Sequence, residues 1–317
     1  NIELDTLDSP IGFHPRVDLF DEQGTCVGSA YESSGQYVQL VAELDEAGTY
    51  YIHVSRYGDG SPSGYNLGLN VDPDSSYQTW MGGSGFEFSI WDGGTTFTLN
   101  GGSFRQNAGD GLSVNTRGAI TLTSIKVDQN KQYGLNLDNS GRVSDCSTRP
   151  CTTTAYLGTG GVSLTSLASA GSSGANSAFG NGWGGAYISS KGAVTITNLD
   201  SYQNGGTGLY LDNCLKLNGI CTGTGSVTIN TNLANWGNWF GENSAEGVAI
   251  ETNGAVVIGR MYALNNSGAG ASIGLTSTPK AVTITNSEFS DNDGNGLIIF
   301  NKGAVTLTNV AAANNRA

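Results

Sequence analysis

Pairs of apolar residues separated by one polar residue recur along the chain from about residue 95 onward. One set follows the motif Asn-x-x-x-Gly, after which the next residue and the residue two places later are apolar. The motif asparagines are Asn107, Asn130, Asn181, Asn204, Asn243, Asn266 and Asn292, and an eighth copy begins at Asn315. The spacing between successive asparagines returns again and again to one short step, as from Asn107 to Asn130, and is longer in between. A step that keeps returning to the same length indicates a structural repeat that carries inserted loops in some copies.

Each repeat also has a first half with a second apolar pair, as in Val194/Ile196, which precedes Leu209/Leu211. Alternation with period two puts each pair on one face of a short strand. One repeat cannot bury its own apolar face, but stacked repeats can. The pattern therefore predicts an all-β protein, a right-handed parallel β-helix of about eight coils with a ~23-residue repeat.

The motif asparagines are predicted to stack in one column at one corner of this β-helix. An asparagine side chain tolerates a left-handed turn, and stacked amides hydrogen-bond between rungs. The motif glycine fits either a positive φ or a close approach of two backbones.

Residues 1–74 do not show this repeat and predict a small β-sandwich built from short strands between turns. The expected strands cover residues 16–20, 26–30, 37–43, 49–56 and 65–71. We expect residues 75–94 to form a linker and a cap on the first coil, with Trp80, Phe86, Phe88 and Trp91 supplying apolar mass. Residues 95–317 then form the β-helix.

Four stretches of the sandwich part resemble the bacterial pre-peptidase C-terminal domain family: Leu4–Pro10, Val17–Gly24, Ala47–Val54 and Gly64–Leu69. The resemblance implies a secreted accessory module without catalysis of its own. Members of that family usually begin with one or two further strands, so the sandwich is expected to be incomplete at its start.

The repeat pattern from residue 95 onward is similar to that of the pectate-lyase-like β-helix superfamily, which implies polysaccharide lyases and hydrolases. Their catalysis needs clustered aspartates beside a histidine, or several calcium-binding acids beside a basic residue. No histidine follows His53. The candidate acids are scattered, at Asp128, Asp138, Asp200, Asp212, Glu251 and Glu288. The sequence therefore predicts a non-catalytic protein.

The net charge of −13 argues against a nucleic-acid partner, and no stretch is long and apolar enough to span a membrane. In the sandwich part, acidic residues greatly outnumber basic ones. Some of these acids must lie close together, so Asp18, Asp21, Glu22 and Asp59 are candidate Ca²⁺ ligands. The alternative is a solvated acidic surface, and no other cofactor is expected.

Four of the five cysteines form two local pairs, which predict the disulfides Cys146–Cys151 and Cys214–Cys221 in inserted loops. Local pairs of this kind favour an oxidising, secreted or cell-surface location. Cys26 remains, either as a small buried apolar residue or as the partner of a segment outside this sequence.

Two further patterns suggest contact surfaces. Inserted loops place Trp183, Trp236, Trp239 and Phe240 among Asn and Gly residues, where they either stack on a sugar or cover the corner of the fold. A Thr-x-Thr layout recurs on the outward face of the first strand of each coil, as in Thr195/Thr197, and is broken at Val257/Gly259. Such arrays occur in ice-binding solenoids, can pack flat against another molecule, or reflect the β-propensity of Thr.

Together these features favour an extracellular structural β-solenoid, such as an adhesin or a filament component. The expected partners are other copies, through head-to-tail contact or strand addition, or other cell-surface components and polysaccharide. The alternative functions are a carbohydrate-binding module and a polysaccharide lyase or hydrolase.

Overall fold

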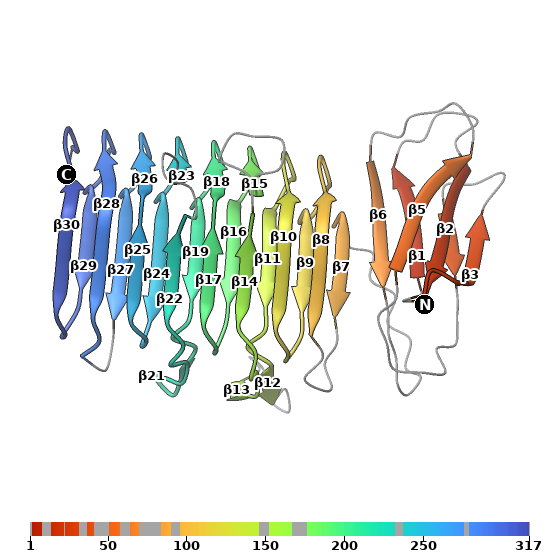
Figure 1. Ribbon diagram of the computed structural model, residues 1–317, viewed down its shortest axis with the longest axis horizontal. Coiled ribbons are helices and arrows are strands. Elements are labelled where there is room, and N and C mark those ends of the chain that lie inside the picture. The colour runs from red at the N-terminus through yellow and green to blue at the C-terminus, as the bar shows by residue number, and fades with distance from the viewer. Residues whose placement is uncertain are drawn as a thin grey trace.

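A computed structural model describes residues 2–7, 14–21, 23–31, 37–40, 51–57, 64–69, 84–89, 96–145, 152–166, 176–231, 237–275 and 279–316. Every regular element in these ranges is a β-strand, and the strands form two large and three small sheets (Figure 1). None of the described segments is a helix, so none of them offers a helical membrane span.

Two short antiparallel groups of strands occupy the N-terminal part. One has the order β4–β1–β6, from Tyr37–Leu40, Ile2–Leu7 and Gly64–Leu69. The other has the order β3–β2–β5, from Cys26–Tyr31, His14–Phe20 and Tyr51–Tyr57. Val17 and Leu19 of β2 and Val38 and Leu40 of β4 are buried, so the two groups share a core. Strand β1 adds to the strands expected here, and where this part ends as a domain stays a prediction.

From residue 86 onward the chain winds into parallel coils, and each coil adds one strand to a sheet that we call sheet I. Its strands in this part are β7 (Phe86–Ser89), β9 (Leu112–Asn115), β11 (Tyr133–Asp138), β16 (Gly184–Ser189), β19 (Leu209–Asp212), β24 (Val248–Thr252), β27 (Ala271–Leu275) and β29 (Leu297–Phe300). Neighbours in this list pair in parallel.

The rest of each coil belongs to sheet II, which bends around a corner. Its strands before the corner are β8 (Phe97–Ser103), β10 (Ile120–Lys126), β14 (Val162–Thr165), β17 (Val194–Thr197), β22 (Val227–Asn230), β25 (Val256–Gly259), β28 (Val282–Ser290) and β30 (Val305–Ala311). Strands β8, β10, β28 and β30 continue around the corner, where they join β15 (Asn176–Phe179), β18 (Leu199–Tyr202), β23 (Asn238–Gly241) and β26 (Met261–Leu264). The predicted right-handed parallel β-helix is confirmed.

The interior is a stack of aliphatic side chains in the predicted register. Leu135 pairs with Leu112 on one side and Ala186 on the other, and all three are almost fully buried. Burial of apolar surface, worth roughly 25 cal/mol per Å², therefore grows with each added coil.

The motif asparagines form one continuous hydrogen-bonded column, which we call the Asn ladder. In each step the backbone N–H and Nδ2 of one asparagine both donate to Oδ1 of the next. The steps join Asn107, Asn130, Asn181, Asn204, Asn243, Asn266, Asn292 and Asn315 in that order. The column compensates the burial of these amides, which would otherwise cost stability.

The left-handed residue of this corner lies one position before each ladder asparagine. These residues are Gln106, Gln129, Gly180, Gln203, Glu242, Asn265, Asp291 and Asn314, with φ between 55° and 65°. The expectation that the ladder asparagine itself takes the left-handed turn is therefore wrong. The motif glycine is needed for close approach: a Cβ on Gly134 would lie 2.6 Å from the carbonyl oxygen of Gly185 on the next rung.

Strand β6 joins the N-terminal strands to the β-helix, because Leu67 and Leu69 pair in parallel with Phe86 and Phe88 of β7. The rings of Phe86 and Phe88 are buried and pack on Phe97. The first strand of sheet I is therefore paired on both sides. Trp80 and Trp91, the other expected cap residues, lie outside the described residues.

Candidate functional site

Four aromatic side chains gather on or beside the outward face of sheet I, and we call them the aromatic strip: Tyr133, Trp183, Tyr187 and Tyr210. Tyr187 and Tyr210 are register partners on β16 and β19, and their rings stack at 5.4 Å with an interplanar angle of 5°. The ring centroids of Tyr133 and Tyr187 lie 5.5 Å apart. The ring of Trp183 meets the ring of Tyr133 edge-on, with their centroids 5.7 Å apart. Trp183 is 56% exposed and the three tyrosines are partly exposed, so the strip is open to a ligand.

A row of carboxylates runs beside the strip, two residues farther along the strands. Register places Asp138 against Ser189, Ser189 against Asp212, and Asp212 against Glu251. Asp138 accepts a hydrogen bond from the backbone N–H of Ser140 at 2.8 Å. Glu251 pairs with Lys216 at 2.8 Å. The aspartates are thus held by the ends of their own strands, and the row presents fixed acceptors.

Burial and these carboxylates keep the tyrosines of the strip protonated. Burial, followed by Glu251 and Asp212, raises the pKa of Tyr210 to about 12. The pKa of Tyr187 is raised too, by burial first and then by Asp212 and Asp138. Both phenols therefore remain hydroxyl groups, able to donate and accept hydrogen bonds, at neutral and mildly alkaline pH.

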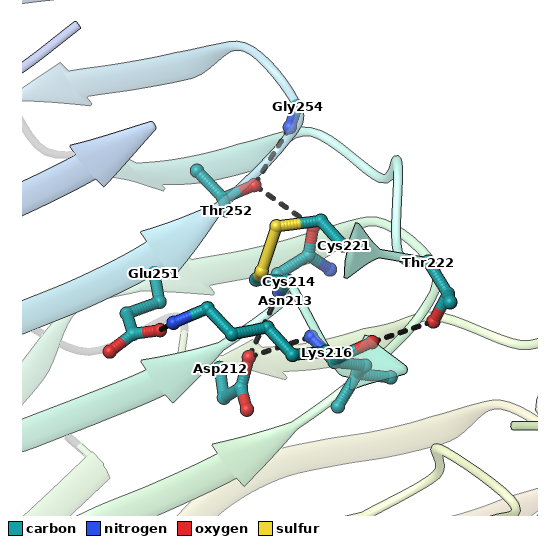
Figure 2. The surroundings of a disulfide bond; sticks show 10 residues. Asp212, Asn213, Cys214, Lys216, Cys221, Thr222, Glu251, Thr252 and Gly254 are labelled. Carbon is teal, nitrogen blue, oxygen red and sulfur yellow. Dashed lines mark hydrogen bonds and ion pairs between the residues drawn. A yellow bond between two sulfur atoms is a disulfide. The ribbon is translucent and has the colours of Figure 1, made fainter. Parts of the chain in front are cut away.

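A disulfide-closed hairpin borders the acidic row (Figure 2). Cys214 and Cys221 are bonded, as predicted, and enclose β20 (Lys216–Leu217) and β21 (Ile220–Cys221). Oδ1 of Asp212 accepts hydrogen bonds from the backbone N–H groups of Cys214 and Leu215, both at 2.9 Å. The hairpin is thereby anchored to the end of β19, and Lys216 reaches Glu251 on the next rung. The other predicted pair, Cys146 and Cys151, lies outside the described residues.

The predicted cluster of aromatic residues in the inserted loops does not form as one group. Trp183 joins the aromatic strip, whereas Trp239 lies on β23 of sheet II, 37% exposed and 6.2 Å from Tyr262. Phe240 is fully buried, because strand alternation turns it inward beside the outward Trp239, so its predicted ligand contact is wrong. Trp236 lies outside the described residues.

The predicted Ca²⁺ ligands divide in a similar way. Asp18 is buried and bonded to Arg16 and Ser29, and Asp21 accepts hydrogen bonds from the backbone N–H groups of its own turn. Glu22 and Asp59 lie outside the described residues. Across the described part of the chain no group of three or more potential metal ligands forms.

Cys26 is exposed, so the expectation that it is buried is wrong. It lies at an end of β3, where its Sγ contacts the carbonyl of Gly28.

Separate from the row of carboxylates, two acids, Glu87 and Asp110, lie near the start of sheet I. Asp110 is 6% exposed and accepts hydrogen bonds from the backbone N–H of Tyr133 at 2.9 Å and from Nδ2 of Asn136 at 2.8 Å. Burial raises the pKa of both carboxyl groups, and Asp110 adds to the rise at Glu87. The repeat pattern missed Asp110, because other repeats carry residues as different as Tyr133 and Gly184 at its position.

Replacing Glu87 by Gln is expected to raise the melting temperature at pH 7. A carboxyl whose folded pKa lies above its unfolded value stabilises the fold at low pH, and this contribution is lost as pH rises through the folded pKa. Gln resembles the protonated carboxyl, so the gain should shrink towards zero at about pH 3. Thermal melts at both pH values measure it, and an equal gain at both would contradict the assignment.

The comparisons with known proteins agree with this geometry. The family model described as "Right handed beta helix region" matches residues 110–282, which is more than half of the chain. The chain belongs to the right-handed β-helix family. No curated protein and no solved structure matches it.

The right-handed β-helix match covers most of the coils and all of the aromatic strip. It does not reach residues 1–109, so the resemblance of the N-terminal part to the pre-peptidase C-terminal family stays a prediction. The resemblance to the pectate-lyase-like superfamily also stays a prediction, because the match identifies the β-helix and no activity.

Proposed function

We propose that this protein is an extracellular, non-catalytic structural β-helix of the adhesin type, which binds glycan chains through the aromatic strip. The observation that carries the proposal is the strip itself: neighbouring rings on or beside the outward face of one sheet. Aromatic side chains offer an apolar face to the C–H face of a sugar, and tyrosine adds a hydroxyl at its edge.

The arrangement suits an extended chain that lies along the axis of the β-helix. Successive rungs are about 4.8 Å apart, so one glycan passes over several of them. It would meet the exposed ring of Trp183, the phenol groups of Tyr187 and Tyr210, and the acceptors Asp138 and Asp212 in the next row. Hydroxyl groups of a neutral polysaccharide donate to such acceptors, whereas an anionic polysaccharide would be repelled by this acidic surface.

The scaffold supports the structural half of the proposal. The Asn ladder and the aliphatic stack fix the strands that carry the three tyrosines of the strip, and strands hold binding groups more rigidly than loops do. The Cys214–Cys221 disulfide favours a location outside the reducing cytoplasm. A stiff stack that carries a disulfide-closed hairpin and a contact face fits a protein that joins a cell surface to a polysaccharide.

Replacing Trp183 or Tyr187 by Ala is expected to weaken binding to neutral polysaccharides by about tenfold, because one stacking contact is lost. Affinity electrophoresis through gels that contain soluble neutral polysaccharides measures the retardation. Trp239→Ala is the matched control, since that tryptophan is also exposed but lies on sheet II. The proposal fails if the wild type shows no retardation, or if Trp239→Ala loses as much as Trp183→Ala.

A polysaccharide hydrolase is the second candidate, because Glu87 and Asp110 form a pair of carboxyl groups and burial raises the pKa of each, as a proton donor requires. Hydrolysis of a glycosidic bond needs one carboxyl group that gives a proton and one that stays charged. Here burial raises both pKa values, and two hydrogen bonds from N–H groups hold Asp110 in place. We therefore expect no release of reducing sugar. Release that Glu87→Gln abolishes would replace the binding proposal with the enzymatic one.

A further inference from the structure

The described outward positions of sheet II before the corner carry no charge, which is unusual for a protein with a net charge of −13. Register places Thr98, Thr121, Ser163, Thr195, Thr228, Val257, Thr283 and Thr306 in one row across the coils. A second row two residues farther along holds Thr123, Thr165, Thr197, Thr285 and Thr308, and it is interrupted by Asn100, Asn230 and Gly259. A third row, mostly of Ala, Gly and Ser, lies on the other side of the first row. The backbone carbonyls of these residues accept hydrogen bonds from the neighbouring rung, as those of Ala193 and Ala281 do.

Strand propensity alone does not explain this face, because sheet I has the same coils and a different outer surface. The matched outward positions of sheet I include Tyr187, Asp212, Glu251 and Phe300, and none of them is a threonine. The strands of both sheets have the same backbone requirements. The threonine rows therefore point to a role of the outer face of sheet II, beyond the preference of threonine for strands.

The composition of the face does not suit a contact between two copies of the chain. Its area is at the lower limit for such a contact, because eight rungs of about 4.8 Å and three outward positions of about 7 Å give roughly 800 Å², and a stable protein–protein interface needs about 800 Å² from each partner. The residues that carry the energy of such interfaces are mostly Trp, Tyr and Arg, whereas Ser, Thr and Val are under-represented among them. The three rows also contain no aromatic residue, which disfavours a sugar as the occupant.

We infer that this face binds ice. Each threonine offers a methyl group that water surrounds and a hydroxyl group that hydrogen-bonds to that water. The hydroxyl groups of Thr123 and Thr165, on neighbouring rungs, lie 3.5 Å apart, within hydrogen-bond distance of each other. Repeats of about 4.8 Å along the axis and about 7 Å across it arrange these groups on a regular two-dimensional lattice. An uncharged, regular face of this kind holds water in an ice-like order, which a growing crystal can incorporate.

The strongest test places a charge in the middle of the array. Thr195→Lys should abolish ice-recrystallisation inhibition and retention of the purified chain in a slowly growing ice front. Ala249→Lys is the matched control, because Ala249 points outward on β24 of sheet I, and it should keep wild-type activity. Circular dichroism melts are expected to show that both variants fold, because both substitutions are at outward positions.

A second variant tests for a gain of activity. Val257 is 42% exposed and is the one residue of the first row without a hydroxyl group, so Val257→Thr should strengthen inhibition by giving every rung of that row a hydroxyl group. Two results would overturn the inference. One is a wild type with no ice retention. The other is a concentration-dependent dimer, seen by light scattering and lost in Thr195→Lys, because the face would then bind a second copy.

Discussion

Asn204→Ala is expected to lower the free energy of unfolding by about 3–5 kcal/mol, because it opens the Asn ladder in its centre. Oδ1 of Asn204 accepts from the backbone N–H and from Nδ2 of Asn181, at 2.9 and 3.0 Å. Its own Nδ2 donates to Asn243 and to the carbonyl of Ala178, at 2.9 and 3.0 Å. Nδ2 also donates to Oγ of Ser201 at 3.2 Å. Alanine removes all five bonds and leaves buried groups without partners.

Urea denaturation followed by circular dichroism measures the loss. Asn100→Ala is the control, because Asn100 is an exposed asparagine on β8, and it should change stability by less than about 0.5 kcal/mol. If the two variants lose equal stability, the ladder adds nothing beyond what any strand asparagine contributes.

Gly208→Ala is expected to cost about 3 kcal/mol or more, because the added methyl group has no room. Its Cβ would lie 2.6 Å from the carbonyl oxygen of Gly247 and 2.7 Å from Nδ2 of Asn243. The first of these atoms is backbone of the next rung, so the rungs would have to separate.

Gly274→Ala is the matched control in the same sheet, since its Cβ would meet only the carbonyl oxygen of Ile250, at 3.8 Å. Alanine there should be neutral or stabilise by up to about 1 kcal/mol, because it restricts the unfolded chain. Thermal and urea unfolding of both variants would decide. A mild effect at Gly208 would show that the rungs can shift apart at low cost.

The fold was predictable because the features that build it repeat. Apolar pairs such as Leu209/Leu211 recur with a fixed relation to the motif asparagine, so coil number, strand position and core followed from the alternation. The left-handed residue was not predictable in the same way, because its side chain varies from Gln203 to Glu242 and only its backbone is constant.

The aromatic strip was only partly predictable. Tyr187 and Tyr210 lie one repeat apart and occupy equivalent positions, which an alignment of the repeats could have found. Tyr133 and Trp183 meet across the longest step of the ladder, so their contact depends on where the inserted loop leaves and re-enters the stack. The inserted loops of the sequence favoured Trp236 and Trp239, as well as Trp183, as sugar-binding residues. The rings that gather in the structure lie mostly on strands.

The Asn ladder makes the same bonds whatever length of chain separates two asparagines. Steps of 23, 26, 39 and 51 residues all end in the same pair of hydrogen bonds to Oδ1. The coil is therefore a module whose outer loops are free to change in length while its inner geometry stays constant. Such a stack can gain or lose whole repeats by recombination, and foreign loops can be grafted between two rungs. The same Asn ladder can therefore support new loops, both in evolution and in engineered variants.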